Sequence, residues 1–182
     1  MLVARNYKLA VLRGAVRLEK PKTGCVRLGY ARVGIFDPRY DRGIWQVSGE
    51  VSFDGGADFA QGSKISVGAK GRLSVGDGFR NTAKGEFICH ERIRLGAGSL
   101  VSWDTLFMDT DFHQVDDKPV SAPVTIGDHV WVGCRCAVLK GAEIPDGSVV
   151  AAGATVTRKL EPERSLIGGV NKVLRTGIEW NV

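Results

Sequence analysis

The chain has 182 residues, of which 43% are hydrophobic and 25% charged, and it carries a formal net charge of +5. This length fits one domain with a sizeable core, and nothing in the composition requires a second. The basic residues form no long run, so nucleic acid is not the expected partner, and an anionic small molecule explains the charge equally well. The apolar run Leu9 to Leu12 is too short for a signal sequence or a membrane span, so we expect a cytoplasmic protein without a membrane span.

The four cysteines have no spacing that suggests a metal site or a redox pair. Cys134-Arg135-Cys136 is too closely spaced for a zinc knuckle, and Cys25 and Cys89 stand alone. We expect all four to be reduced packing residues.

Residues 1–46 are the least periodic part of the chain. Residues 2–13 could form a short amphipathic helix, whereas Gly14 and the echo of Val16-Arg17-Leu18 in Val26-Arg27-Leu28 favour strands after it. Asp37-Pro38 predicts a turn. We expect this segment to cap the core and to form the first irregular coils, and a contact surface for another subunit is the alternative.

From residue 47 onward, large apolar residues recur at every sixth position. The first series is followed four places later by Val51, Ala57, Ser63 and Ala69, and the frame slips near Gly71 and again near Ile93. A period of six is produced neither by a helix nor by a single strand, and it is typical of a hexapeptide-repeat parallel β-helix. The expected inward positions up to residue 107 are Val47, Phe53, Phe59, Ile65, Val75, Asn81, Phe87, Leu95, Val101 and Phe107.

The six-residue period stops after His113 and resumes at Ile126. Residues 114–125 contain Asp116, Asp117, Pro119 and Pro123, which predict an exposed loop that leaves the coil and returns. The second series then continues through Ile126, Val132, Val138, Ile144, Val150 and Val156. We therefore predict a repeat region over residues 47–160 and a C-terminal cap over residues 161–182, with Trp180 packed on the helix end.

Three segments resemble hexapeptide-repeat acyltransferases. They are residues 102–113 with the run Met108-Asp109-Thr110-Asp111-Phe112-His113, residues 125–133 with Ile126-Gly127-Asp128-His129-Val130-Trp131, and residues 144–158. The nearest likeness is to acetyltransferases of capsular, lipopolysaccharide or other cell-surface sugars, kin to the maltose and galactoside acetyltransferases. The resemblance implies an all-β, left-handed parallel β-helix, an acetyl-CoA donor, and a homotrimer with active sites between neighbouring subunits.

The resemblance places His113 where the family has its catalytic histidine, at the root of the loop. A histidine suits this chemistry because its ordinary pKa lets it take a proton from a sugar hydroxyl at neutral pH. Asp109 or Asp111 could orient the imidazole, and Asp111 is favoured because a carboxylate in a slot that is usually small and inward breaks the repeat rule. Alternatively, both aspartates satisfy turn amides and His113 is an ordinary loop residue.

The family binds acetyl-CoA along its later coils, where small residues let the backbone approach the pantetheine arm. The candidates here are Gly133, Ala137, Ala152 and Gly153, with Trp131 beside the thioester, although a β-helix corner needs small residues for its own packing. Thr157, Arg158 and Lys159 could contact the phosphates or form a solvated basic turn. Lys172 keeps its place in the family's closing segment, where Val170 and Asn171 replace the expected Pro and Ala.

The two other histidines are expected to be exposed. His129 lies in a turn and could edge the site with Asp128, and His90 is expected at a surface corner. Zinc binding by the three histidines is excluded because their spacing is too wide, so we expect no metal.

Three functions compete. The leading one is an acyl-CoA-dependent O-acetyltransferase acting on a sugar or glycan precursor without a metal. The others are N-acetylation of an amino-sugar nucleotide and a non-catalytic β-helix scaffold.

Overall fold

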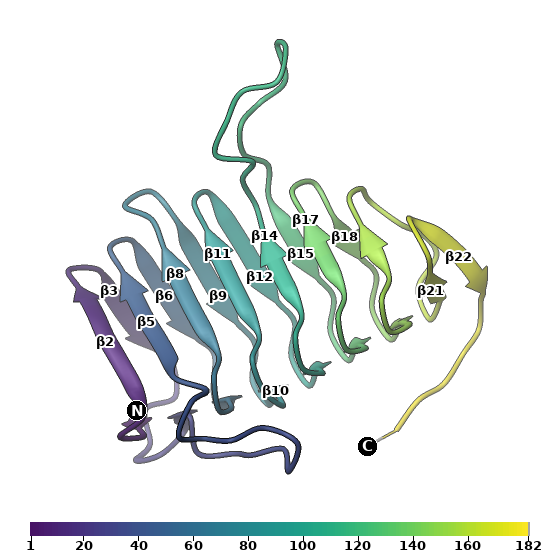
Figure 1. Ribbon diagram of the computed structural model, residues 1–182. Coiled ribbons are helices and arrows are strands. Elements are labelled where there is room, and N and C mark those ends of the chain that lie inside the picture. Colours follow the sequence, from purple (N-terminus) through teal and green to yellow (C-terminus); the bar gives the residue numbers. More distant parts are fainter. Residues whose placement is uncertain (182) are drawn as a thin grey trace.

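The computed structural model describes residues 1–181, which form three parallel sheets stacked around one axis (Figure 1). Sheet A contains β1 (Leu2–Val3), β4 (Val26–Leu28), β7 (Ala57–Phe59), β10 (Phe79–Asn81), β13 (Leu100–Val101), β16 (Trp131–Val132), β19 (Val149–Val150), β21 (Leu166–Gly168) and β22 (Lys172–Arg175). Sheet B contains β2 (Tyr7–Leu12), β5 (Gly43–Val47), β8 (Lys64–Val67), β11 (Glu86–Cys89), β14 (Leu106–Met108), β17 (Ala137–Leu139) and β20 (Thr155–Val156). Sheet C contains β3 (Ala15–Leu18), β6 (Glu50–Phe53), β9 (Arg72–Val75), β12 (Arg92–Leu95), β15 (Val124–Ile126) and β18 (Glu143–Ile144).

Successive strands run through sheets A, B and C in turn, so each coil adds one strand to each sheet. In Figure 1 the strands of sheet B rise in front, those of sheet C descend behind, and the chain advances from left to right, which makes the β-helix left-handed. The all-β, left-handed parallel β-helix expected from the family resemblance is confirmed. Antiparallel pairing of β22 with β21 closes the C-terminal end.

The residues expected at inward positions fill the core. All sixteen residues of the two series are at most 2% exposed, from Val47 through Val156. Phe59, Phe79, Phe87 and Phe107 form a column of aromatic rings, in which Phe87 and Phe107 stack with centroids 5.1 Å apart. Asn81 is tolerated in this column because its Oδ1 accepts a hydrogen bond from Ser63 Oγ at 2.5 Å. The period of six therefore predicts which side chains are buried.

The N-terminal segment differs from the expected helix. Residues 7–12 form β2, which pairs with β5 in sheet B, so the expectation of an amphipathic helix is wrong. Backbone hydrogen bonds to the next coil decide this conformation, and they outweigh the weak helical pattern. The echo of residues 16–18 in residues 26–28 correctly predicts strands, and the turn at Asp37 is confirmed by the hydrogen bond that Tyr40 N donates to Asp37 O at 3.1 Å.

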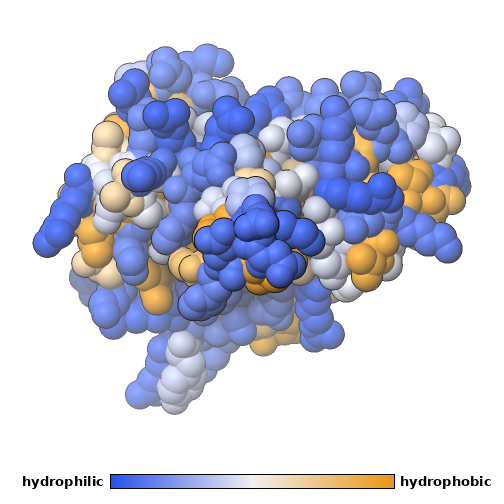
Figure 2. Space-filling view, turned by 90° about the horizontal axis from the view of Figure 1, so that it is seen from above, coloured by the Kyte–Doolittle hydropathy of each residue, from blue (hydrophilic) through white to orange (hydrophobic). Residues whose placement is uncertain are grey.

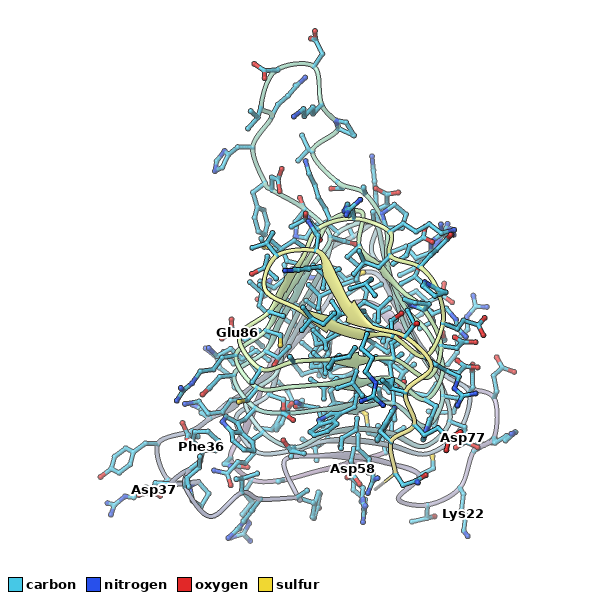
Figure 3. All side chains as sticks on the ribbon, turned by 90° about the vertical axis from the view of Figure 1, so that its right-hand side faces the viewer. Lys22, Phe36, Asp37, Asp58, Asp77 and Glu86 are labelled. Carbon is cyan, nitrogen blue, oxygen red and sulfur yellow. The ribbon has the colours of Figure 1, made fainter. Side chains whose placement is uncertain are left out.

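The sheets meet at three corners, which Figure 3 shows from the C-terminal end. A loop of residues 109–123, hereafter the arm, projects from the corner between sheets B and C. A second loop, residues 29–42, leaves the corner between sheets A and B and carries Phe36 and Asp37. Residues 19–25, with Lys22, lie at the corner between sheets C and A. The candidate site residues are distributed over these corners.

The part of the chain that the structure describes contains no helix with the length and hydrophobicity needed to cross a membrane. All four cysteines are free thiols, and Cys89 and Cys136 are buried.

Candidate active site

The arm is held together near its base by backbone pairing. Thr110 and Ser121 form an antiparallel bridge, Asp111 N donates to Val120 O at 2.9 Å, and Ala122 N donates to Asp109 O at 3.0 Å. Lys140 in the next coil pairs with the Asp111 carboxylate and donates to Pro119 O at 2.7 Å. The arm thus leaves the body along a defined path, as Figure 3 shows.

His113 stands on this arm with its side chain in solvent. Within residues 1–181, its imidazole makes no hydrogen bond or ion pair. The preceding residue, Phe112, has a positive φ of 60° and packs edge-on against the His90 ring at 4.8 Å. This contact holds the root of the arm against the body, so His90 lies at a surface corner as expected and supports the arm. His113 is free to meet a ligand or another chain.

Within the described residues, neither aspartate forms a hydrogen bond or an ion pair with His113. Asp109 is fully buried, and its carboxylate accepts hydrogen bonds from His90 N at 2.7 Å and Glu91 N at 2.8 Å. These bonds match the alternative in which the carboxylate satisfies turn amides. The prediction that Asp111 occupies an inward slot is wrong, because its side chain is 39% exposed and pairs with Lys140. The repeat ends at residue 109, where the arm leaves the coil.

The expected pantetheine contacts lie on two sheets and the corner between them. Gly133, Ala152 and Gly153 share the corner between sheets A and B, where Gly153 N donates to Cys134 O at 2.9 Å. Ala137 begins β17 in sheet B, and Trp131 begins β16 in sheet A. A Cβ on Gly133 would lie 2.7 Å from Ala152 N, so coil packing alone requires glycine there. Gly153 and Ala152 are exposed and leave their backbone accessible.

Three of the expected phosphate contacts, Thr157, Arg158 and Lys159, follow β20 at the corner between sheets B and C, whereas Lys172 begins β22 in sheet A. Thr157 N donates to Asn171 Oδ1 at 2.7 Å, and Arg158 Nη2 lies 3.4 Å from Asn171 O. Lys159 pairs with Glu143 at 3.5 Å and Glu161 at 3.4 Å, and these carboxylates raise the pKa of its ammonium group. Two glutamates therefore compete for Lys159, whereas Arg158 and Lys172 have no acidic partner within residues 1–181.

The C-terminal tail makes a contact that the sequence did not indicate. Trp180 stacks on His129 with ring centroids 4.2 Å apart, and its Nε1 donates to His129 O at 2.9 Å. The Trp131 ring lies 6.1 Å from Trp180. The expectation that Trp180 packs on the helix end is wrong, because His129 lies on the flank between β15 and β16. An aromatic tail residue carries no repeat signal, so periodicity could not place it.

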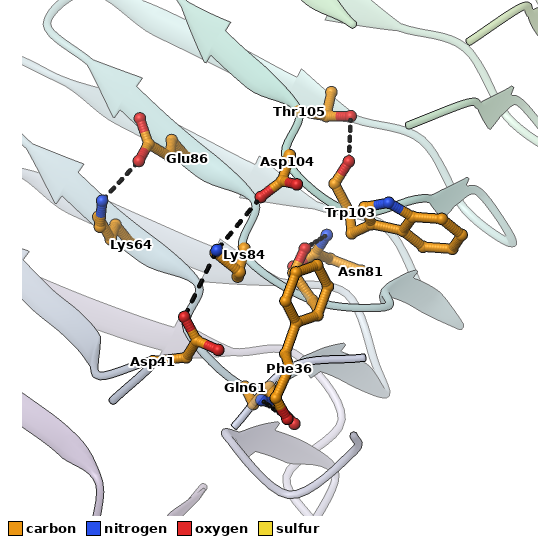
Figure 4. Close-up of polar contacts among 11 residues, drawn as sticks. Phe36, Asp41, Gln61, Lys64, Asn81, Lys84, Glu86, Trp103, Asp104 and Thr105 are labelled. Atoms are coloured by element: carbon orange, nitrogen blue, oxygen red, sulfur yellow. Dashed lines mark hydrogen bonds and ion pairs between the residues drawn. The ribbon is translucent and has the colours of Figure 1, made fainter. Parts of the chain in front are cut away.

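A polar hollow at the corner between sheets A and B was also missed (Figure 4). Lys84 lies at its centre, with Nζ 3.4 Å from Asp41 and 3.6 Å from Asp104. Lys64 and Glu86 pair at 2.6 Å on its rim, and Tyr40 adds an exposed ring. Acidic, basic and aromatic groups together suit a ligand with many hydroxyl groups. The loop of residues 29–42 supplies Asp41 and Tyr40, and its lack of periodicity concealed them.

The structure offers no metal site within residues 1–181, where no three His, Cys, Asp or Glu side chains gather as ligands.

Comparison with known families identifies the repeat. Residues 123–158 match the family described as bacterial transferase hexapeptide (six repeats). Residues 123–158 thus carry the hexapeptide repeat of this family. The matched residues begin at the end of the arm and include the six-residue series from Ile126 to Val156, so the resemblance inferred from the sequence is confirmed.

Relatives of known sequence agree with this assignment. The chain is 36% identical over 64 residues to a putative acetyltransferase of Staphylococcus aureus (strain Mu50), a match that covers 35% of this chain and 32% of the relative. It is 32% identical over 136 residues to an uncharacterized 24.8 kDa protein in the cps region of Klebsiella pneumoniae, covering 72% of this chain and 61% of the relative. The chain thus spans about a third of the length of the first curated relatives it matches.

Two solved structures share the fold. The polySia specific acetyltransferase NeuO superposes with a TM-score of 0.56 at 16% identity, covering 98% of this chain and 90% of NeuO. A mutant of AntD, an N-acyltransferase from Bacillus cereus in complex with dTDP and coenzyme A, superposes with a TM-score of 0.53 at 14% identity, covering 93% of this chain and 80% of AntD. At these identities the likeness extends to the fold alone.

Proposed function

We propose that this hexapeptide-repeat protein is an acetyl-CoA-dependent O-acetyltransferase whose acceptor is a hydroxyl of a sugar or of a cell-surface glycan precursor. The observation that carries the proposal is the arm, which presents an exposed histidine directly before the matched repeats. The relatives described as acetyltransferases support the acetyl group, and NeuO supports a glycan acceptor. Use of acetyl-CoA also favours a cytoplasmic location.

In the proposed reaction, His113 is the general base. Its neutral imidazole takes the proton of the acceptor hydroxyl as that oxygen attacks the thioester carbonyl carbon. When the carbon–sulfur bond breaks, the departing thiolate takes the proton from the imidazolium, so the products are an acetyl ester and CoA. The reaction needs neither a metal nor a covalent enzyme intermediate. Arg158 and Lys172, whose charges have no acidic partner within residues 1–181, are suited to the phosphates of the donor.

We place the acceptor in the hollow around Lys84, with each active site shared between two copies of the chain. Within one chain, His113 projects from the corner between sheets B and C, whereas the hollow lies at the corner between sheets A and B. One copy therefore cannot bring the two together. A closed homotrimer solves this geometry, because the arm of each copy then reaches the hollow of the next.

The decisive experiment measures CoA release from acetyl-CoA against a panel of sugars and sugar nucleotides. Replacing His113 with Ala should lower kcat/KM by at least about 100-fold, because the general base is lost. Asp117→Ala, on the same arm, is the matched control and should remain active. Full activity of the His113→Ala variant would refute the assigned base. A chain without acetyl-CoA turnover and without acetyl-CoA-dependent thermal stabilisation would be a non-catalytic scaffold.

Shared sites can be tested by mixing two inactive variants. Lys84→Ala removes the centre of the hollow, and His113→Ala removes the base. When both are refolded together, about a quarter of the sites in random trimers combine an intact hollow with an intact arm, so activity should return to about that fraction. Continued inactivity of the mixture, with both variants trimeric, would place the complete site within one chain.

N-acetylation of an amino-sugar nucleotide is the second candidate. It is favoured by the shared fold of AntD, whose structure is described as an N-acyltransferase with dTDP and coenzyme A. Amino and hydroxyl forms of the same sugar, compared in the CoA-release assay, distinguish the two functions. An amine-only reaction would replace the O-acetyltransferase proposal.

A further inference from the structure

The first coil leaves the hydrophobic core open at one end of the helix. β1, β2 and β3 are the terminal strands of their sheets, and no coil formed by residues 1–181 stacks on their outer edges. Leu9 and Val16 lie in register with the buried residues Trp45 and Val51, yet they are 47% and 41% exposed. Leu12, in register with Val47, is 65% exposed. These side chains are core residues without a cover.

The net positive charge of the chain comes from the N-terminal segment that contains this coil. Residues 1–42 contain ten Lys or Arg and three Asp or Glu, a formal charge of +7, whereas the remaining residues sum to −2. Within residues 1–181, Arg5, Lys8 and Arg13 form no ion pair. At the left end of Figure 2, which carries β2, hydrophobic side chains lie between hydrophilic ones. We call the exposed side chains of residues 1–17 the basal face.

We propose that the basal face docks on an anionic lipid bilayer. A bilayer interface satisfies both features at once, because leucine side chains gain by entering the acyl boundary while basic side chains contact anionic headgroups. The exposed leucines lie on the end of a rigid helix, so they can enter the interface without unfolding. The chain would then lie with its axis upright and its arm above the surface.

Charge and hydrophobicity together distinguish the bilayer from other occupants. A second copy docked end to end would bring two positively charged coils together, which like-charge repulsion opposes. A soluble polyanion would match the charge but would leave Leu9, Leu12 and Val16 in water. The lipid surface is therefore the occupant that both observations favour.

Vesicle co-sedimentation tests the proposal on the full chain. We expect binding to phosphatidylcholine vesicles that contain phosphatidylglycerol, and little binding to phosphatidylcholine alone. Each basic residue near an anionic surface contributes about a fivefold gain in affinity, so Lys8→Gln with Arg13→Gln should weaken binding about 25-fold. Leu9→Gln with Leu12→Gln should weaken it at least about tenfold. All four side chains are exposed, so we expect both variants to fold. Unchanged melting temperatures would verify this.

The matched control is at the opposite end of the helix. Leu174 is 51% exposed in β22, beside Arg175, so Leu174→Gln with Arg175→Gln removes one exposed leucine and one positive charge there. This variant should bind anionic vesicles within about twofold of the original chain. Absence of binding to anionic vesicles would overturn the proposal. Normal vesicle binding by the leucine variant would also overturn it and would indicate a site for a soluble polyanion. Loss of an end-to-end dimer in that variant would overturn it in favour of a second copy of the chain.

Discussion

Asp109 supports the structure at the base of the arm through its buried carboxylate. The two carboxylate oxygens accept the backbone amides of His90 and Glu91 at 2.7 and 2.8 Å. Asp109→Ala would leave both amides without a partner, so we expect the free energy of unfolding to fall by about 2–5 kcal/mol. Urea unfolding at neutral pH measures this change.

The neighbouring Asp111 is the control, since it is exposed and Lys140 is its one ion-pair partner among residues 1–181. Asp111→Ala should cost less than about 1 kcal/mol, as is usual for exposed ion pairs. If Asp109→Ala retained full stability and lost only activity, Asp109 would be catalytic and its structural role would be refuted.

The buried thiol of Cys89 makes the free energy of unfolding depend on pH in the alkaline range. Burial, together with the nearby Asp109 carboxylate, raises the pKa of this thiol from 9.0 to about 12. Between these values the unfolded chain has lost the proton that the folded chain retains, so stability falls as pH rises, by up to about 1.4 kcal/mol per pH unit. Cys89→Ala should therefore make the pH dependence of urea unfolding shallower between about pH 9 and 11.

Val67→Ala provides the comparison for Cys89, because Val67 pairs with Cys89 in sheet B and is equally buried. This variant should lose stability by a similar amount at every pH and keep the original slope. Equal slopes in the Cys89→Ala and Val67→Ala variants would contradict the role of the thiol.

At the scale of strands, periodicity predicts the core because each coil repeats the same geometry. A residue such as Phe87 lies in register with Ile65 in the preceding coil and with Phe107 in the following coil. These coils are longer than three hexads, and their corners take up the additional residues, so the inward position is kept. Even the polar Asn81 follows the rule, since its inward position is fixed by the coil and its amide finds partners there. The inward slots were therefore predictable from the sequence alone.

Elements outside the repeat were not predictable in the same way. The helical pattern of residues 2–13 failed because strand pairing with β5 depends on contacts distant in sequence. The frame predicted for Asp111 failed because the chain leaves the coil two residues earlier, at Asp109. The position of Trp180 on His129 follows from the path of the tail, which no local pattern specifies.

At the scale of the whole molecule, only part of the candidate site could be predicted from the sequence. The family resemblance located His113, and the structure places it on an arm that projects from one corner (Figure 1). The hollow around Lys84 combines residues 41, 84 and 104, which are far apart in sequence and come together only through coil stacking. A sequence motif can indicate the base, whereas the acceptor site requires the three-dimensional arrangement.

We therefore expect that the arm can be shortened without destabilising the β-helix. Because Asp111 N donates to Val120 O, replacing residues 112–119 with Asn-Gly would close a two-residue hairpin on the existing bridge of Thr110 and Ser121. Every arm residue removed is exposed, so the free energy of unfolding should change by less than about 1 kcal/mol. In the proposed trimer the arm of each copy contacts the next, so sedimentation velocity should show weaker self-association than in the His113→Ala variant, which keeps the arm. A trimer of undiminished stability would show that the arm does not hold the copies together, and a large loss of unfolding free energy would show that it belongs to the folded core.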